Sequence, residues 1–411
     1  MKKKMLVYAN YFYPEVASLS QILTELCEGI SDEFDINVIC SVPCYTGKIE
    51  EKYKTQKYYY EEYKGINIIR VKVADFDKAN KISRIKHILS YFFNAILATR
   101  KVKNVDVVYT VSQPPFLGGL LGVIGKRMTK GKLIYNIQDF NPEQTMAVGY
   151  SKSKTLLKFL MLLDKYSCKK SDLVIVVGRD MEETLIKRFK NKKVPNHVVI
   201  NNWMNEKEVY PLEKKHEKVI EFKKKYNLQE KFVIMYSGNI GLFYDLENII
   251  KIIAKFKDKD IAFAFVGEGA MKENLENYVK DNGVDNVVFI PYQDKKDLIY
   301  SLNSADVHIV ANAKGIKGVS VPSKIYGILA TDVPMIGILE KDSEAWKIIE
   351  DSNTGVLAEA GNYDEIENIF NEVISSKEKF VKKHLGGRKY LEDRFTKDKS
   401  IMKYKEEIKK L

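Results

Sequence analysis

The residues whose types are best suited to binding a ligand lie late in the chain, where Ser320, Ser323 and Lys324 stand at the start of an apolar, helix-like segment. Ser323 fits the N-cap of that helix, and the first backbone N–H groups of a helix have no partner within it. Together with the Lys324 ammonium they would form an anion site suited to a diphosphate. A capped surface helix with a solvated lysine would show the same residues, so this turn alone does not decide between the two.

Two glycine-containing turns follow apolar, strand-like segments in the same half of the chain. Gly238 and Asn239 come directly after FVIMYS, and Gly267 and Glu268 come directly after IAFAFV. Glycine at the end of a strand lets the backbone approach a ligand closely. The Glu268 carboxylate could accept a hydrogen bond from a ribose hydroxyl. Neither turn has G-x-G-x-x-G spacing, and ordinary turns also contain such glycines.

Acidic side chains occupy a corresponding place in the first half. Asp139 and Glu143 follow the strand-like segment KLIYNI. A carboxylate at the end of a strand can orient a hydroxyl nucleophile or act as its general base. Helix capping by Asp139 is the structural alternative.

Two loops of the first half also follow strand-like segments. The first contains Glu15, and the second, over 43–48, contains Tyr45 and Lys48. Because parallel strands present their carboxyl ends at one edge of a sheet, these loops could form one wall of an acceptor pocket.

Several other kinds of site are not indicated. The D-x-D strings at 75–77 and 258–260 fit solvated turns, since neither lies between a strand and a helix. The five histidines show no metal-ligand spacing, and the four cysteines form no C-x-x-C pair. There is no P-loop, and the tyrosines do not interleave with basic runs as in a nucleic-acid-binding surface. We therefore expect no metal, no cofactor, no nucleic-acid partner and reduced cysteines.

Alternating strand-like and helix-like segments must position these residues. Apolar runs rich in Val, Ile and Tyr alternate with helical patterns up to HVVINNW, and the pattern restarts at KFVIMYSG after a charged connector. This alternation predicts parallel sheets covered by helices on both faces. We expect an α/β protein with two Rossmann-like domains, over 1–205 and 206–389, facing an inter-domain cleft where ligands bind. A helix over about 390–411 should pack back on the first domain.

Composition and charge narrow the function further. The 411 residues are 45% hydrophobic and 30% charged, which suits globular domains and excludes a disordered or collagen-like chain. Residues 1–200 hold 33 lysines and arginines against 20 acidic residues, a formal charge of +13, whereas residues 201–411 carry −1. A basic half suits nucleic acid, an anionic membrane surface or an acidic substrate, and charge alone does not choose among them. No apolar run reaches the roughly 18 residues that span a bilayer.

The segment 81–103 combines apolar residues at helical spacing with basic residues near its ends. This combination suits a helix that lies on an anionic membrane surface. A core-facing helix with extended lysines is the alternative. The apolar set is Ile82, Ile85, Ile88, Leu89, Phe92, Phe93, Ile96 and Leu97, and the basic set is Lys81, Arg84, Lys86, Arg100, Lys101 and Lys103.

Taken in order, short motifs along nearly the whole chain resemble those of GT-B glycosyltransferases of family 4, and more narrowly the bacterial capsule and O-antigen enzymes of the WbuB and colanic acid type. Each motif alone is weak, but their order is specific. The motifs are FYPE (12–15), PCYTGK (43–48), VSQPPFLG (111–118), QDFNPE (138–143), VVINNW (198–203), YSGNIG (236–241), VGEG (266–269), IPY (290–292), LNSADV (302–307), VPSKIYGILA (321–330) and GRKYLEDRF (387–395).

The resemblance implies transfer of a sugar from a nucleotide diphosphate donor, with UDP as the expected nucleotide. The C-terminal domain would bind the nucleotide sugar and the N-terminal domain the acceptor. By position, the base would lie at Pro291, Tyr292 and Gln293, and the ribose near Glu344 or Glu268. The turns with Asn239 and Gly267 would line the donor site, with the diphosphate at Gly238, Ser320, Ser323 and Lys324. The acceptor would lie at Glu15, Tyr45, Lys48, Asp139 and Glu143.

Members of this type usually act without a metal, on a lipid-pyrophosphate-linked sugar at the cytoplasmic face of the membrane. The resemblance therefore implies a cytoplasmic protein held peripherally on the inner membrane, which the basic first half would suit. The chain departs from the family pattern at three places. Val319 and Gly327 stand where many members have two glutamates, 242–245 reads LFYD where an Arg and a Lys are common, and Gln138-Asp139 replaces a histidine.

On this basis we expect a retaining transfer in which Lys324 and the helix start stabilise the leaving diphosphate and Asp139 positions or deprotonates the acceptor hydroxyl. With the Arg and Lys absent, Lys314 or Lys317 could assist Lys324. A nucleotide-sugar 2-epimerase of the same architecture is one alternative. A catalytically degenerate basic protein that binds RNA or a lipid surface is the other.

Overall fold

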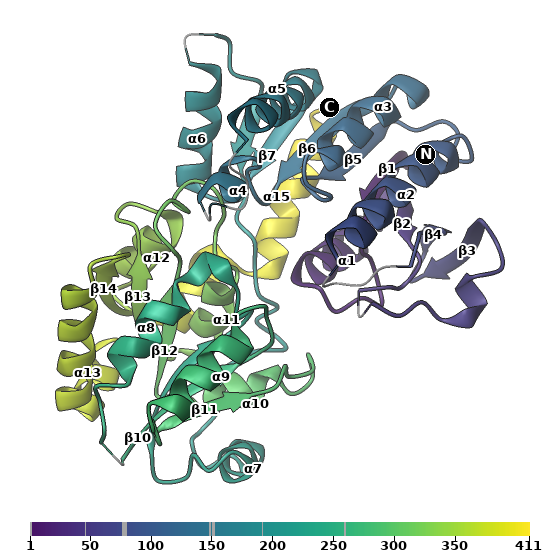
Figure 1. The fold of residues 1–411 in the computed structure, drawn as a ribbon. Coiled ribbons are helices and arrows are strands. Elements are labelled where there is room, and N and C mark those ends of the chain that lie inside the picture. Colours follow the sequence, from purple (N-terminus) through teal and green to yellow (C-terminus); the bar gives the residue numbers. More distant parts are fainter. Residues whose placement is uncertain are drawn as a thin grey trace. The chain divides into compact units, whose positions relative to one another are not determined.

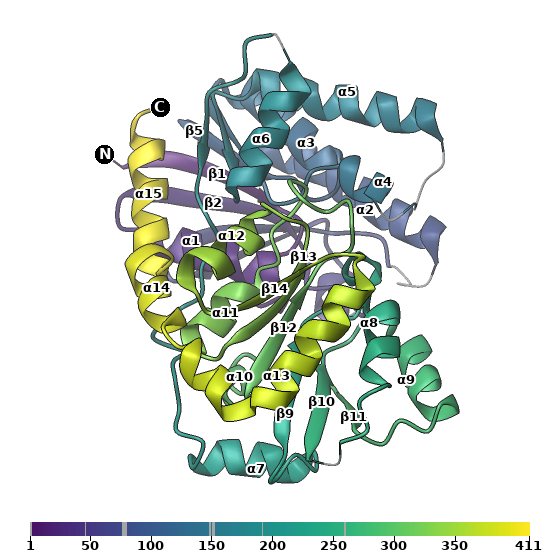
Figure 2. The same cartoon turned by 90° about the vertical axis from the view of Figure 1, so that its left-hand side faces the viewer.

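The computed structural model describes residues 2–45, 47–75, 80–147, 149, 153–190, 192–258 and 260–411. They divide into two units. Unit 1 is drawn from Met1–Met146, Ser151–Asn201 and Asp398–Leu411, and unit 2 from Ala147–Tyr150 and Asn202–Lys397. Figures 1 and 2 show that each unit is a sheet with helices on both faces. The predicted α/β class with two Rossmann-like sheets is confirmed.

Unit 1 is built on an eight-stranded sheet with the order β3-β4-β2-β1-β5-β6-β7-β8. The strand pairs are parallel except β3 with β4, an antiparallel pair. The strands are β1 (Lys3–Ala9), β2 (Phe34–Ser41), β3 (Tyr58–Tyr63), β4 (Ile66–Val71), β5 (Val107–Val111), β6 (Lys132–Ile137), β7 (Leu173–Val176) and β8 (His197–Val199). The helices are α1 (Ser18–Ile30), η1 (Glu51–Tyr53), α2 (Lys81–Thr99), α3 (Leu117–Thr129), α4 (Glu143–Ala147), α5 (Lys154–Lys170), α6 (Arg179–Phe189) and α15 (Lys397–Lys409).

Unit 2 is built on a six-stranded sheet with the order β11-β10-β9-β12-β13-β14, in which the pairs are parallel. The strands are β9 (Phe232–Ser237), β10 (Ile261–Val266), β11 (Val287–Ile290), β12 (Val307–Ala311), β13 (Met335–Leu339) and β14 (Gly355–Glu359). The helices are α7 (Glu217–Lys225), η2 (Leu242–Tyr244), α8 (Leu246–Ile253), α9 (Lys272–Asp281), α10 (Leu298–Asn303), α11 (Lys324–Thr331), α12 (Glu344–Ser352), α13 (Tyr363–Lys383) and α14 (Gly387–Arg394).

Both faces of the second sheet are buried, which explains why its strands read as continuous apolar runs. Side chains alternate between the faces of a strand. In β13, Ile336 and Ile338 join the cluster that contains Ile249 of α8 and Phe370 of α13. Met335 and Leu339 join the cluster that contains residues of α11, α12 and α14. Figure 2 shows α13 running across one face of this sheet.

Polar side chains begin several of the helices. Asn80, Ser153, Ser343 and Asn362 each accept a hydrogen bond from a backbone N–H in the first turn of the helix that follows, namely α2, α5, α12 and α13. Such caps satisfy donors that have no partner inside the helix. The loops that follow strands therefore end at defined residues, and this holds the strand-end side chains in place.

The C-terminal segment forms two helices, whereas one helix over about 390–411 was expected. α14 packs in unit 2, where the Arg388 guanidinium donates to the carbonyls of Glu206 and Val209, 3.0 Å each. α15 packs in unit 1, where the Tyr404 hydroxyl accepts a 2.8 Å hydrogen bond from the Asn136 amide. The break between the two helices lets one segment of chain contribute to both cores.

Candidate functional site

The two glycine turns of unit 2 pack directly against each other at the carboxyl end of the sheet. Gly238 and Gly267 have φ angles of 146° and 139°, which side-chain-bearing residues rarely adopt. A Cβ on Gly267 would come within 2.0 Å of the Gly238 carbonyl oxygen. The Ile240 N–H also donates to the Glu268 carbonyl at 2.9 Å. Glycine is therefore required here for the close packing of the two backbones at the ends of β9 and β10.

Lys324, the first residue of α11, reaches this pair of turns. Its Cε and Nζ atoms would lie 3.2 Å from a Cβ on Gly238. The ammonium nitrogen is enclosed and has no hydrogen-bond partner among the described residues. Burial lowers the pKa of Lys324 well below its ordinary value. A buried cation without an acceptor is costly, so this nitrogen is suited to an anion that enters from outside.

The loop that leads into α11 is held by Glu340, a residue that the sequence patterns did not single out. Its Oε2 accepts the backbone N–H groups of Gly315 and Lys317 at 2.8 and 2.7 Å. Ser320 lies half-buried in this loop. Ser323 occupies the N-cap position of α11 as expected, but its side chain makes no capping hydrogen bond to the described backbone. The predicted N-cap position of Ser323 is therefore confirmed, but the capping hydrogen bond to its side chain is not formed within the described residues.

The remaining predicted donor residues lie at ends of neighbouring strands. Pro291, Tyr292 and Gln293 follow β11, and the Tyr292 side chain is 50% exposed. Glu268 follows β10, and its carboxylate is exposed and 2.8 Å from the Lys272 ammonium. Asn239 is exposed after β9. All follow parallel strands of one sheet, so they share one edge with Gly238 and Lys324.

Glu344 and the two auxiliary lysines differ from these residues in their surroundings. Glu344, in the first turn of α12, is only 2% exposed. Lys314 is exposed, and the Lys317 ammonium lies 3.7 Å from the Asp342 carboxylate. The ribose role of Glu344 and the phosphate role of the auxiliary lysines stay predictions.

In unit 1, Asp139 lies just beyond the end of β6. Its backbone N–H donates to the Ser112 hydroxyl at 3.2 Å, and its Oδ1 accepts from the Gln144 amide at 3.2 Å. Burial raises the pKa of Asp139 to about 6, and the bond from Gln144 lowers it only in part. A carboxylate with a pKa near neutrality has the basicity that a general base needs at neutral pH.

The loops at 11–15 and 43–48 meet, as predicted for two neighbouring strand ends. The Glu15 Oε1 accepts the backbone N–H groups of Cys44 and Tyr45 at 2.5 and 2.8 Å. The Tyr45 ring packs edge-on against Tyr11, with ring centres 5.4 Å apart. Lys48 is exposed, and Thr46 of this motif lies outside the described residues. Glu15 thus orders the second loop, and the acceptor role of this group stays a prediction.

Glu143 is engaged by a buried arginine that sequence patterns did not indicate. Its Oε1 accepts a 2.7 Å hydrogen bond from the Nε of Arg188. The same guanidinium pairs with Asp164, which also accepts a 2.6 Å hydrogen bond from the Tyr135 hydroxyl. Arg188 and Asp164 are 7% and 3% exposed. In this structure Glu143 therefore helps to neutralise a buried charge, which is a structural contribution; contact with an acceptor stays a prediction.

Helix α2 has an apolar row on its exposed side. Ile82, Ile85, Leu89 and Phe93 are 66%, 57%, 41% and 59% exposed. Phe92 is 7% exposed and packs in the core of unit 1, as the core-facing alternative predicts. One side of α2 therefore packs in the core, another presents apolar residues to solvent, and contact with a membrane stays a prediction.

Helix α5 has a similar exposed set. Leu156, Phe159 and Leu162 are 47%, 61% and 58% exposed, and Lys154 and Lys158 are exposed beside them. Within the described residues, no helix is long and apolar enough to cross a membrane.

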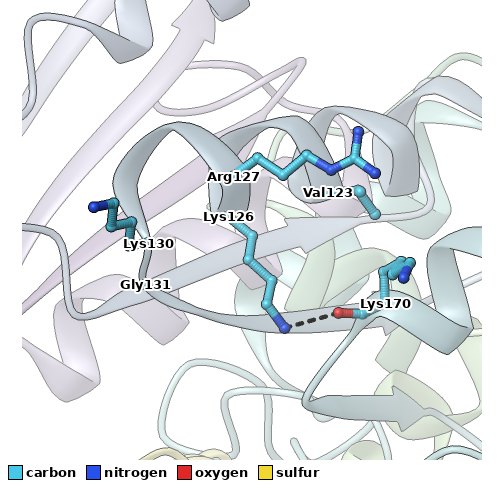
Figure 3. Close-up of a pocket in the computed structure, with 6 residues that line it drawn as sticks. All are labelled: Val123, Lys126, Arg127, Lys130, Gly131 and Lys170. Atoms are coloured by element: carbon cyan, nitrogen blue, oxygen red, sulfur yellow. Dashed lines mark hydrogen bonds between the residues drawn. The ribbon is translucent and has the colours of Figure 1, made fainter.

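A basic hollow of about 390 Å³ lies where α3 ends, at the edge of the sheet opposite to the strand ends above. Figure 3 shows the Lys126 ammonium pointing at the Lys170 carbonyl, at 2.9 Å, while Arg127 and Lys130 extend in other directions. Lys126 is also 2.6 Å from the Asp172 carboxylate. Lys126, one of the basic residues that line the hollow, is thus neutralised. The hollow is separate from the candidate site.

The described residues contain no group of three or more His, Cys, Asp or Glu side chains that could hold a metal ion. The D-x-D string at 75–77 follows β4 and precedes α2, so the expectation that neither string lies between a strand and a helix was wrong for it. Phe76, Asp77 and Lys259 lie outside the described residues. Asp258 accepts the backbone N–H of Asp260 at 2.9 Å and lies 3.3 Å from the Lys377 ammonium, as expected of a solvated turn. The four cysteines are free.

Comparisons with known proteins bear on both units. Residues 218–385 match the family model described as glycosyl transferases group 1. The chain is 28% identical over 289 residues to the probable glycosyltransferase WbjE of Pseudomonas aeruginosa, covering 68% of this chain and 70% of that protein. It is 25% identical to the putative colanic acid biosynthesis glycosyl transferase WcaI of Escherichia coli K12, covering 84% and 86%.

Solved structures share the whole architecture at low sequence identity. Sucrose-phosphate synthase from Thermosynechococcus elongatus aligns with a TM-score of 0.77 and 14% identity, over 100% of this chain and 99% of that one. Anabaena HepE in complex with UDP and glucose aligns with a TM-score of 0.73 and 14% identity, over 100% of both chains. These likenesses concern the fold.

Proposed function

We propose that the protein is a nucleotide-sugar glycosyltransferase of group 1 with the GT-B fold, and that it transfers a sugar from a UDP-sugar to a lipid-linked saccharide during assembly of a bacterial surface polysaccharide. The observation that carries the proposal is the enclosed Lys324 ammonium, which lies without a hydrogen-bond partner in the described structure beside the Gly238 turn. The UDP bound in HepE supports the choice of nucleotide. The colanic acid role in the name of WcaI supports the polysaccharide.

We assign the donor to unit 2 and the acceptor to unit 1. The bond between the sugar and the β-phosphate oxygen of UDP breaks, and a new bond forms between the sugar and an acceptor hydroxyl oxygen. Lys324 and the N–H groups at the start of α11 stabilise the charge that builds on the leaving diphosphate. Asp139 takes the proton of the acceptor hydroxyl, and its raised pKa suits that task. The transfer proceeds with retention at the sugar carbon and without a metal.

The substitution Lys324→Met tests the diphosphate role. Losing one charged group at a transition state typically costs about 3 kcal/mol, or roughly a hundredfold in rate. We expect this loss in UDP release with a lipid-linked saccharide extract as acceptor. Lys382→Met is the matched control, because Lys382 is exposed on α13 and its ion pair with Glu378, at 3.9 Å, is a surface pair that should matter little. Near-normal turnover of a folded Lys324→Met protein would remove the assignment.

A thermal-shift series with UDP, GDP, ADP and their sugars tests the nucleotide. A ligand that binds the native state raises the melting temperature, and we expect the largest rise with UDP compounds. Incubation of the UDP-sugar without acceptor distinguishes the transferase from a 2-epimerase, because only the epimerase would convert the donor alone. The group 1 match favours the transferase.

We also propose that unit 1 holds the protein peripherally on an anionic, cytoplasmic membrane surface, where a lipid-pyrophosphate-linked acceptor would lie. The exposed apolar row of α2 is flanked by the exposed basic residues Arg84, Lys86 and Arg100. Exposed apolar residues with neighbouring lysines and arginines suit insertion at a lipid interface. The exposed set on α5 offers a second contact of the same kind.

A further inference from the structure

The Lys324 ammonium lies against two aromatic rings. Its nitrogen is 3.5 Å from the ring centre of Tyr236 in β9 and 4.4 Å from that of Tyr244 in η2. The two ring centres are 6.0 Å apart, and the rings are inclined at 61° to each other. The tyrosines therefore form two walls around the ammonium. We call these two rings, of Tyr236 and Tyr244, the tyrosine cage.

The tyrosine cage satisfies the lysine only in part. An aromatic face attracts a cation, but an ammonium offers three N–H donors that need acceptor atoms. None of the three has a hydrogen-bond acceptor within the described parts of the chain. The two tyrosine rings and the Gly238 turn, which lie against the nitrogen, carry no charge, and burial is the cause of the lowered pKa of Lys324. Burial raises the pKa of Tyr236 well above its usual value, which keeps that hydroxyl neutral.

We infer, building on the proposed function, that the tyrosine cage keeps Lys324 in position for the donor diphosphate and that one proton from solution joins Lys324 when the nucleotide binds. The diphosphate oxygens supply both the acceptors and the opposite charge that aromatic rings lack. The proton adds to the lone pair of the lysine nitrogen, and buffer is its source. Tyr236 and Tyr244 thus act as positioning residues, through Lys324.

The sign of the pH dependence follows from which form of the lysine the ligand prefers. Burial favours the neutral form in the free protein, and a bound diphosphate favours the charged form. Below the pKa that Lys324 has in the unliganded protein, the lysine already carries its proton, and UDP binding takes up none. Above it, each binding event takes up a proton, and UDP affinity falls by up to about tenfold per pH unit until the pKa of the bound state is reached.

Tyr244 is the better position for a test, because it is half-buried in a turn, whereas Tyr236 is fully buried. The Tyr236 hydroxyl also donates to the Asn239 carbonyl at 2.7 Å and helps to hold that turn. Replacing the Tyr244 ring with a smaller side chain admits water to Lys324. The free lysine should then regain a pKa nearer its ordinary value and hold its proton before the nucleotide arrives.

The experiment is titration calorimetry of UDP into the full-length protein between pH 7.5 and 9, in two buffers of different ionisation enthalpy. The second phosphate ionisation has a pKa of about 6, so UDP itself takes up little proton in this range. We expect uptake that rises towards one proton per UDP in the wild type and in Tyr244→Phe, which keeps the ring. Uptake should fall at least twofold in Tyr244→Leu and vanish in Lys324→Met.

Tyr300→Leu is the matched control, because the Tyr300 ring also lies under a lysine, with the Lys218 nitrogen 4.8 Å away, but on α10 away from the strand ends. It should behave as the wild type. A wild type that binds no UDP would contradict the proposed function itself. UDP binding without proton uptake, or with unchanged uptake in Tyr244→Leu or Lys324→Met, would overturn the inference and leave the proposed function standing.

Discussion

The two units treat buried charge in opposite ways. In unit 1, the Arg188 guanidinium is paired with the carboxylates of Glu143 and Asp164, and the Glu15 carboxylate is bonded to backbone N–H groups. In unit 2, the Lys324 side-chain nitrogen is enclosed and has no hydrogen-bond partner within the described residues, although two tyrosine rings lie against it. A paired buried charge holds the fold together, whereas an unpaired one is stabilised only when a ligand arrives. The difference separates a scaffold contact from a binding site.

The largest expected effect is a loss of unfolding free energy when the buried ion pairs of Arg188 in unit 1 are broken. Arg188→Met would leave the buried Asp164 and the half-buried Glu143 without their cation, and removing one partner of a buried pair typically costs about 3–5 kcal/mol of unfolding free energy. Urea denaturation followed by tyrosine fluorescence would measure it.

Lys187→Met is the control for Arg188, since Lys187 is exposed and its ion pair with Glu183 at 3.7 Å is a surface pair. It should cost about 0.5 kcal/mol or less. An Arg188→Met protein as stable as the control would show that the buried pair is not what holds α6 to this part of unit 1.

Asp139 lies between the two extremes, because burial is only partly offset by the bond from Gln144. We predict that activity rises with pH through about 6 as Asp139 ionises, and that Asp139→Asn lowers turnover roughly a hundredfold and removes this limb. A pH–rate profile measures both. A mutant with unchanged turnover across this range would exclude Asp139 as the base.

The same substitution has a stability signature with a definite sign. The pKa of Asp139 is raised in the folded protein from its ordinary value of 3.8 to about 6. The native state therefore gains stability from the protonated group below pH 3.8 and loses it as pH rises through about 6. The unfolding free energy of Asp139→Asn minus that of the wild type should therefore be larger at pH 7 than at pH 3.5.

The smallest effect concerns the surface of unit 1. We predict that Phe93→Ser, at a 59% exposed position of α2, weakens binding to vesicles of anionic lipid about tenfold and leaves unfolding free energy nearly unchanged. Phe92→Ser, at a 7% exposed core position, should instead destabilise unit 1. Vesicle sedimentation and urea denaturation separate the two. Equal vesicle binding by wild type and Phe93→Ser would argue against α2 as the contact.

Much of the fold could be predicted from the sequence because it depends on local patterns. The sequence pattern restarts at KFVIMYSG, and β9 (Phe232–Ser237), the first strand of unit 2, lies there because its apolar run is continuous. Strand β3 (Tyr58–Tyr63) was missed, because its tyrosines and glutamates lie at a sheet edge and form no continuous apolar run.

The candidate site was predictable only where chemistry and position coincide. Lys324 could be found because it starts a helix after a strand of a parallel sheet. Its neighbours Tyr236 and Tyr244 could not, because the rings come from about 80 residues earlier in the chain and only packing brings them to the ammonium. The pairing of Glu143 with Arg188 and the opposite fates of Phe92 and Phe93 likewise depend on tertiary contacts that helical spacing does not show.

The most direct test of the central claim compares UDP with uridine, which differ by the diphosphate alone, for the wild type and for Lys324→Met at pH 7. If the Lys324 ammonium binds the diphosphate, the wild type should bind UDP at least tenfold more tightly than uridine, and the variant should lose most of this preference while its affinity for uridine stays the same. A folded variant that keeps the full preference for UDP would contradict the claim.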